Sequence, residues 1–292
     1  MLQMDTVDME AVSYCSLFFT SYVSTLYLFP AIAGVYVTIL NSDWLIEQCH
    51  FKSNVATAVA GGLYIDGMKR LRLWQSEFAS NSALIGGAVH LKDSEDIVLS
   101  NSSYMSNEGS LLSGGQGGAM TMYFCLNVSI DSSTFDSNAA WTGAAIYSVQ
   151  TSELHVMRSH FTNNVAPDAG GALLVENNNV VNIFNSSFFS NVGSAGGSIA
   201  MSESFDVEIK LSAFIANQAS SLSGSALLVK GTQLTLENNS FTENEAPKGI
   251  FILYNVVAFY KVHGIHILDS QVYLIELDFL NLPRRWDSLL DV

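Results

Sequence analysis

One motif recurs eight times along this 292-residue chain and restricts its fold more than any other feature. Each copy contains an aromatic residue, called position F below, and an asparagine three residues later. The aromatic residues are Phe51, Phe78, Tyr104, Phe135, Phe161, Phe188, Phe214 and Phe241. The asparagines are Asn54, Asn81, Asn107, Asn138, Asn164, Asn191, Asn217 and Asn244. The copies follow one another every 26 to 31 residues. This period predicts a stacked array, because one such unit cannot bury its own apolar face.

Within each copy, apolar residues recur at every second position. Positions F−7 and F−5 are apolar in all eight copies, as at Leu154 and Val156, whereas F−6 and F−4 are mixed and often polar. Positions F−15 and F−13 are also mostly apolar. A period of two is typical of a strand with one side facing inward. Short strands stacked about 4.8 Å apart make a parallel β-helix. The sequence therefore predicts an all-β solenoid of eight regular rungs with degenerate rungs at its ends.

The small and polar positions of the repeat suit the corners and interior of such a solenoid. Position F−17 is glycine in seven copies, with Ala144 as the exception, and no length change is expected between it and the asparagine. Glycine permits a positive φ or a close backbone approach at a corner. Asparagine tolerates left-handed geometry and can form an amide ladder between rungs. Position F−2, mostly serine, should face inward and needs hydrogen-bond partners there. The aromatic residues should stack rung on rung in the core.

The pairing of Gly-Gly-Ala, at 86–88, 117–119 and 170–172, with the Phe-x-x-Asn motif resembles the repeats of chlamydial polymorphic outer membrane proteins. The resemblance covers about residues 33–250. It implies a right-handed β-helix of the pectin-lyase-like superfamily that is exposed at the cell surface and used in adhesion. Members of that family end in a β-barrel translocator, for which residues 251–292 are too short. The resemblance transfers no catalytic residue.

The chain divides into three parts. Residues 33–250 hold the repeats, and residues 251–292 lose the register and are expected to form a degraded rung and a C-terminal cap. Two interpretations stay open for residues 1–32. They form a degenerate rung or cap, with Leu17 at F−5 and Tyr22 at F, or a membrane or signal segment, because the uncharged stretch exceeds the ~20 residues that a span needs. Membrane contact is expected only if residues 11–40 form a span.

Charge and cysteine content bear on which ligands the chain can bind and on whether it contains disulfides. The net charge is −15 with only 12 basic residues, which argues against nucleic-acid binding, since that needs stripes of Lys and Arg. Three cysteines do not make a disulfide framework. Cys49 takes the place of a serine at F−2, so a buried thiol is expected there, and the hydrophobic stretches around Cys15 and Cys125 favour the same state.

Four Asn-x-Ser sequons give a signal for secretion. They begin at Asn101, Asn127, Asn185 and Asn238. Three of these asparagines occupy position F−3, which we expect to face water. A sequon on a surface loop is the acceptor for N-linked glycans. The chain is therefore expected to be extracellular or at the cell surface.

The outward positions hold one candidate site on neighbouring rungs. Position F−6 carries His155, Asn182 and Glu208 in succession, and Lys210 lies nearby. A histidine and a carboxylate two rungs apart are too far apart for direct proton transfer, but they could bind a sugar, with Phe184 as a stacking platform.

A second candidate platform is Trp74 beside Arg72. Enzymes that cleave polysaccharides need clustered carboxylates with a basic residue or Ca²⁺. The sequence has no Asp-Asp pair and no Asp-x-Asp. No metal site, cofactor or catalytic residue is predicted.

Two function classes remain. The first is a non-enzymatic, secreted or cell-surface solenoid that presents an extended face for adhesion, with a glycan or a surface protein as its partner. The second is a carbohydrate-active β-helix, such as a polysaccharide lyase, hydrolase or epimerase. The absence of clustered acids favours the first.

Overall fold

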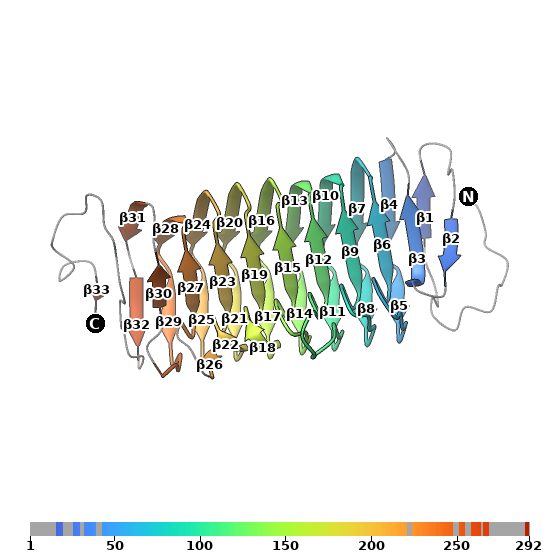
Figure 1. The fold of residues 1–292 in the computed structure, drawn as a ribbon. Coiled ribbons are helices and arrows are strands. Elements are labelled where there is room, and N and C mark those ends of the chain that lie inside the picture. The colour runs from blue at the N-terminus through green and yellow to red at the C-terminus, as the bar shows by residue number, and fades with distance from the viewer. Residues whose placement is uncertain are drawn as a thin grey trace.

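The computed structural model describes residues 16–19, 26–29, 32–38, 43–220, 224–247, 251–254, 258–263, 265–268 and 290–291. These residues form an elongated solenoid built of strands, with no helix in the described segments (Figure 1). Each rung passes through three strands, and equivalent strands of successive rungs pair in parallel into three long sheets. The prediction of an all-β parallel β-helix is therefore confirmed.

Within a rung, the chain passes through sheet 1, then sheet 2 and then sheet 3. Sheet 1 contains β2 (Leu26–Phe29), β3 (Ile32–Thr38), β6 (Leu63–Asp66), β9 (Val89–Lys92), β12 (Met120–Tyr123), β15 (Ile146–Val149), β19 (Leu173–Glu176), β23 (Ile199–Ser202), β27 (Leu227–Lys230) and β30 (Phe251–Tyr254). Sheet 2 contains β1 (Ser16–Phe19), β4 (Asp43–Glu47), β7 (Arg70–Trp74), β10 (Glu95–Ser100), β13 (Leu126–Asp131), β16 (Glu153–Met157), β20 (Val180–Phe184), β24 (Asp206–Lys210), β28 (Gln233–Glu237) and β31 (Ala258–His263). Sheet 3 contains β5 (His50–Lys52), β8 (Glu77–Ala79), β11 (Ser103–Met105), β14 (Thr134–Asp136), β17 (His160–Thr162), β21 (Ser187–Phe189), β25 (Ala213–Ile215), β29 (Ser240–Thr242), β32 (Ile265–Leu268) and β33 (Leu290–Asp291). A small fourth sheet contains β18 (Val165–Ala169), β22 (Val192–Ala195) and β26 (Gln218–Ala219).

The two ends of the solenoid differ in their pairing. At the N-terminal end, β1 pairs with β4 and β2 pairs with β3, both antiparallel. Leu17 does lie opposite Ile46, the F−5 residue of the next rung, but in the reverse direction from the parallel rung that the sequence predicts. Tyr22 lies outside the described residues. At the other end, β30, β31 and β32 each pair in parallel with the preceding rung, as in a ninth rung. Most of residues 269–292 lie outside the described residues, so the predicted C-terminal cap stays a prediction.

The aromatic residues form one continuous stack along the axis. Seven contacts join the eight rings, with centroids 4.6 to 5.0 Å apart and ring planes within 9° of parallel. The rings are fully buried, as are the aliphatic residues at F−7 and F−5, such as Leu154 and Val156. Inward residues of sheet 1, such as Val89 and Leu91, complete this core. Burial of these side chains supplies the main driving force for folding.

The asparagines form the predicted amide ladder. From Asn54 to Asn217, each Nδ2 donates a hydrogen bond to Oδ1 of the asparagine in the next rung, at 2.7 to 3.0 Å. From the second rung onward, the same Nδ2 also donates to the carbonyl oxygen of the preceding aromatic residue, as from Asn164 to Phe135 at 3.0 Å. The ladder therefore satisfies buried polar groups that would otherwise destabilise the corner.

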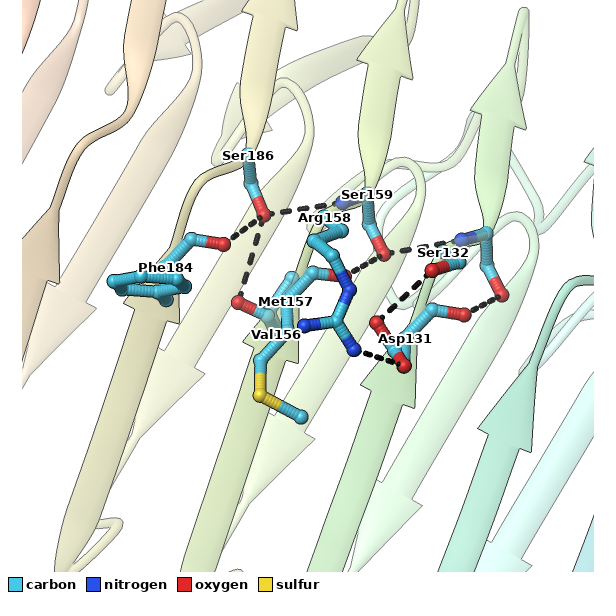
Figure 2. Close-up of polar contacts among 9 residues, drawn as sticks. Asp131, Ser132, Val156, Met157, Arg158, Ser159, Phe184 and Ser186 are labelled. Carbon is cyan, nitrogen blue, oxygen red and sulfur yellow. Dashed lines mark hydrogen bonds and ion pairs between the residues drawn. The ribbon is translucent and has the colours of Figure 1, made fainter.

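The serines at F−2 form a second ladder. The backbone N–H of Ser159 donates to Oγ of Ser186 at 3.2 Å (Figure 2). The backbone N–H of Ser133 donates to Oγ of Ser159, also at 3.2 Å. Each Oγ in turn donates to a carbonyl oxygen two residues earlier, as Ser186 does to Phe184 at 3.0 Å. The hydroxyl is the smallest side-chain group that can both accept and donate here, which explains why serine recurs.

A further inward polar column lies at the corner between sheets 1 and 2, and the sequence did not reveal it. Its members are Ser94, Cys125, Thr151, Asn178, Ser204 and Thr232. For example, Thr151 N–H donates to Oδ1 of Asn178 at 3.0 Å. The residue type changes from rung to rung, so this column lacks the uniform signal of the serines at F−2.

The corner before sheet 1 uses two successive residues in different ways. Gly170 has a positive φ of 66°, whereas a Cβ atom on Gly171, at F−17, would lie 2.0 Å from the carbonyl oxygen of Gly197. The close approach predicted at F−17 is therefore present, and the positive φ belongs to the residue before it. The expected constant spacing is wrong in rung eight, where one residue is lost and Gly224 aligns with Gly196 instead of Gly197. Rung one shows a similar one-residue shift.

The cysteines do not all behave as predicted. Cys125 is a free, buried thiol, as expected. Cys49 is disulfide-bonded, so the prediction of a buried thiol at this position is wrong. Cys15 lies outside the described residues. The serine-like position of Cys49 gave no signal of the bond, because pairing depends on which chain segment lies next to the sulfur.

Candidate functional site

The outer face of sheet 2 brings together the site predicted at F−6. His155, Asn182 and Glu208 lie in register on β16, β20 and β24. The Nδ2 of Asn182 lies 3.1 Å from Nδ1 of His155, so the amide donates to the ring nitrogen. Nε2 of His155 is 3.7 Å from a carboxylate oxygen of Glu153. Asn182 separates His155 from Glu208, so these two do not form a direct acid/base pair.

Lys210 and Phe184 complete this group, which we call the sheet 2 row: His155, Asn182, Phe184, Glu208 and Lys210. Phe184 lies in register with Lys210 and is 39% exposed. The ammonium group of Lys210 is 2.8 Å from Glu208 and 3.9 Å from Glu237. The hydrogen bond to Glu208 is the main cause of a raised Lys210 pKa. The row therefore holds a charged pair, an amide, an imidazole and an open aromatic ring on one flat surface.

The second predicted platform lies at the N-terminal end of the same sheet. Arg72 and Trp74 both face outward from β7, and Trp74 is 37% exposed. Their register neighbours include the apolar Leu45 and Val98 on either side of Arg72. Arg70, on the same strand, forms an ion pair with Asp43. This platform carries fewer polar groups suited to a ligand than the sheet 2 row.

A polar aromatic group on the outer face of sheet 1 was missed by sequence reasoning. His90 Nδ1 lies 2.5 Å from Oγ1 of Thr121. The His90 ring stacks on Tyr64 at 4.9 Å and contacts the Tyr123 ring at 5.3 Å. Further along the sheet, the hydroxyl of Tyr147 donates to Glu176 at 2.7 Å. The sequence does place aromatic residues at outward positions of successive sheet 1 strands, which could have indicated this group. Outward positions are expected to be solvated, however, so no contact between these residues was predicted.

Burial sets the chemistry of this sheet 1 group. His90 is only 5% exposed although it faces outward. Burial, with a smaller effect of Lys92, lowers the pKa of His90 to about 4. Burial also raises the pKa of Tyr123 to about 12. His90 is therefore neutral at pH 7, and the group is a covered hydrogen-bonding cluster with little surface to offer a ligand.

The remaining surface of the described segments offers open depressions. One, of about 310 Å³, lies on sheet 3 beside Asp136 and His160. No group of three His, Cys, Asp or Glu side chains in the described ranges is placed to hold a metal ion. No helix in the part of the chain that the structure describes is long and apolar enough to cross a membrane. Both interpretations of residues 1–32 remain predictions.

Comparison with known proteins identifies the fold and one relative. A family model described as "Right handed beta helix region" matches residues 33–214, which is more than half of the chain. A metabotropic glutamate receptor-like protein R from Dictyostelium discoideum is 26% identical over 141 residues, which cover 48% of this chain and 7% of that protein. The chain therefore spans a small fraction of the length of this relative. No solved structure matches the chain.

Proposed function

Because the chain belongs to the right-handed β-helix family, we propose that it is a non-enzymatic, cell-surface or secreted β-helix that binds a neutral glycan on the sheet 2 row. The observation that carries this proposal is the exposed ring of Phe184 beside Asn182, Glu208 and Lys210. An aromatic ring can pack against the apolar face of a sugar, while an amide and a carboxylate bond its hydroxyl groups.

Charge favours a neutral ligand. The chain carries a net charge of −15, which repels polyanionic glycans. The cation of the row, Lys210, is already balanced by Glu208 and Glu237. A neutral sugar can approach this face without crossing a repulsive field.

Three observations support a surface or secreted location. The relative from Dictyostelium discoideum is named as receptor-like. Cys49 is disulfide-bonded, and disulfides persist mainly in oxidising compartments. The repeats also resemble those of chlamydial polymorphic outer membrane proteins, whose β-helices act in adhesion.

The geometry favours binding over catalysis. His155 is engaged by Asn182, and Glu208 is engaged by Lys210. A general acid and base must both reach the same substrate bond, and these two groups lie two rungs apart. A carbohydrate-active β-helix is the alternative outcome of the test.

The test is a glycan array followed by titration of the best neutral glycan. Phe184→Ala removes the exposed ring and should weaken binding about tenfold or more, because the stacking surface is lost. Phe124→Ala is the matched control, since Phe124 is 49% exposed on rung four, away from the row. It should leave the affinity unchanged.

Three results would contradict the proposal. They are no binding to any glycan, equal losses in both variants, or tight capture of a partner protein without glycan affinity. Cleavage of a polysaccharide that is abolished by His155→Ala would instead establish the enzymatic alternative.

A further inference from the structure

Three of the four sequons share one corner of the solenoid, between sheets 2 and 3. Position F−3 forms this corner column, whose members are Gln48, Gln75, Asn101, Ser132, Arg158, Asn185, Leu211 and Asn238. All eight residues have positive φ, from 47° to 54°. Figure 2 shows two of them, Ser132 and Arg158, on the outer side of the bend.

The three asparagines of this column are open to solvent. Asn101, Asn185 and Asn238 are exposed. None of the three makes a side-chain hydrogen bond within the described ranges. The ladder asparagines, by contrast, are buried and hydrogen-bonded on both sides. The corner amides are therefore accessible for modification.

The fold accounts for only part of each sequon. The middle residue is Ser102, Ser186 or Asn239, and each is buried in the F−2 ladder. Positive φ favours asparagine at F−3, although other residue types also occur there. The third residue, at F−1, faces outward from sheet 3, and no feature of the repeat requires a hydroxyl there.

The hydroxyl nevertheless accompanies the asparagine. In the three rungs with asparagine at the corner, position F−1 is Ser103, Ser187 or Ser240. In the other five rungs it is His50, Glu77, Thr134, His160 or Ala213, of which only Thr134 carries a hydroxyl. Ser187 also contacts His160 at 2.6 Å, but Ser103 and Ser240 make no side-chain hydrogen bond within the described ranges. The backbone does not impose this pairing of positions F−3 and F−1, whereas a sequon does.

We propose that Asn101, Asn185 and Asn238 carry N-linked glycans and form a glycosylated edge between sheets 2 and 3. The co-reactant is a lipid-diphosphate-linked oligosaccharide. The carboxamide nitrogen forms a bond to the anomeric carbon of the sugar as the bond from that carbon to the diphosphate oxygen breaks. The lipid diphosphate leaves with the electron pair, and the amide loses one proton to the transferase.

The position of this edge has a consequence for the rest of the surface. Asn185 directly follows Phe184, and Asn238 directly follows Glu237, so two of the glycans would flank the sheet 2 row. We leave Asn127 out of the proposal because it lies at the start of β13 and its Nδ2 donates to Asp96 at 2.7 Å. The outer face of sheet 1 would stay uncovered.

The test uses the full chain purified from the cells that naturally make it. A peptide N-glycosidase in isotopically labelled water marks each occupied asparagine for peptide mass mapping. We expect labels at all three corner asparagines. In a secreting eukaryotic host, Ser103→Ala, Ser187→Ala and Ser240→Ala should each remove the mass of one glycan, with an unchanged circular dichroism spectrum.

A transplanted sequon tests the corner itself. Arg158→Asn combined with His160→Ser creates the same motif in rung five and should add the mass of one glycan. Unmodified corner asparagines in protein collected from the cell surface or medium would overturn the proposal. This inference rests on the proposed surface location but not on glycan binding. Unmodified protein found outside the cell refutes the glycans alone, whereas protein confined to the cytosol refutes both location and glycans.

Discussion

At the scale of single residues, Tyr104 is the exception in the aromatic stack. Its ring packs like the others, 5.0 Å from Phe78 and 4.6 Å from Phe135. Its hydroxyl is buried without a hydrogen-bond partner among the described residues, and burial raises its pKa. An unsatisfied buried hydroxyl costs free energy, so tyrosine at this position makes the folded protein less stable than phenylalanine would.

Tyr104→Phe should therefore raise the free energy of unfolding by about 1 kcal/mol. Urea unfolding measures the change. Tyr147→Phe is the matched control, because its hydroxyl donates to Glu176, and it should lower the free energy of unfolding by about 1 kcal/mol. Destabilisation by Tyr104→Phe would mean that the hydroxyl has a partner after all.

His90 gives stability a dependence on pH. Its pKa is about 4 in the folded chain, below the ordinary histidine value of 6.5 that applies to the unfolded chain. Between these values the unfolded chain binds a proton that the folded chain excludes, so the free energy of unfolding falls as the pH drops from about 6.5 to about 4. The full effect is about 3 kcal/mol. His90→Gln should remove this part of the pH dependence in urea unfolding at about pH 7 and about pH 4.5. If the free energy of unfolding changed equally with pH in the native chain and in His90→Gln, the imidazole of His90 would not be buried and neutral.

At the scale of elements, the asparagine side chain stabilises the corner after sheet 3 by hydrogen bonds to the neighbouring rungs. Oδ1 of Asn164 accepts from the backbone N–H and the side chain of Asn138, and Nδ2 donates to Asn191 and Phe135. One side chain thereby satisfies groups on the two neighbouring rungs. Any apolar substitute leaves several buried donors and acceptors unpaired.

Asn164→Leu should lower the free energy of unfolding by about 3 kcal/mol or more, since each unpaired buried group costs about 1–3 kcal/mol. Asn179→Ala is the control, because Asn179 is exposed and makes a single 3.4 Å side-chain contact with Ser152. Its effect should stay within about 0.5 kcal/mol. Similar losses in the two variants, measured by urea unfolding, would show that the ladder adds nothing specific.

At the scale of the whole molecule, the solenoid is a one-dimensional stack. Each rung pairs with the rung before it and the rung after it, as β16 pairs with β13 and β20. Stability in such an array is close to a sum of rung terms and neighbour terms. Opening should therefore begin at a weak rung and spread along the axis, because no rung is held by distant ones.

Hydrogen exchange followed by mass spectrometry should show this directly. In the native chain, amides of the regular rungs around Phe135, Phe161 and Phe188 should exchange most slowly. In Asn164→Leu, protection should fall most in the rung of Phe161 and its two neighbours, and less in the rungs of Phe51 and Phe241. An equal loss in every rung would instead indicate one global unfolding event.

The sequence alone determined the path of the chain and the inside of the solenoid. Strict positions such as F, F−5 and the asparagine repeat because each side chain stacks on its own kind about 4.8 Å away. It also placed His155, Asn182 and Glu208 side by side on adjacent strands. Once the inward residues fix the register of the strands, the positions of the outward residues are fixed as well. Their role in binding remains a prediction.

The tertiary structure decided the features that occur at single positions and are not part of the repeat pattern. It showed that His90 is covered although it faces outward, that Cys49 is disulfide-bonded, that β1 runs antiparallel, and that Gly224 aligns with Gly196. The physical reason is common to these cases. A period of two tells which side of a strand faces inward, but the neighbours of an outward, terminal or corner residue come from other rungs, and their contacts depend on packing in three dimensions.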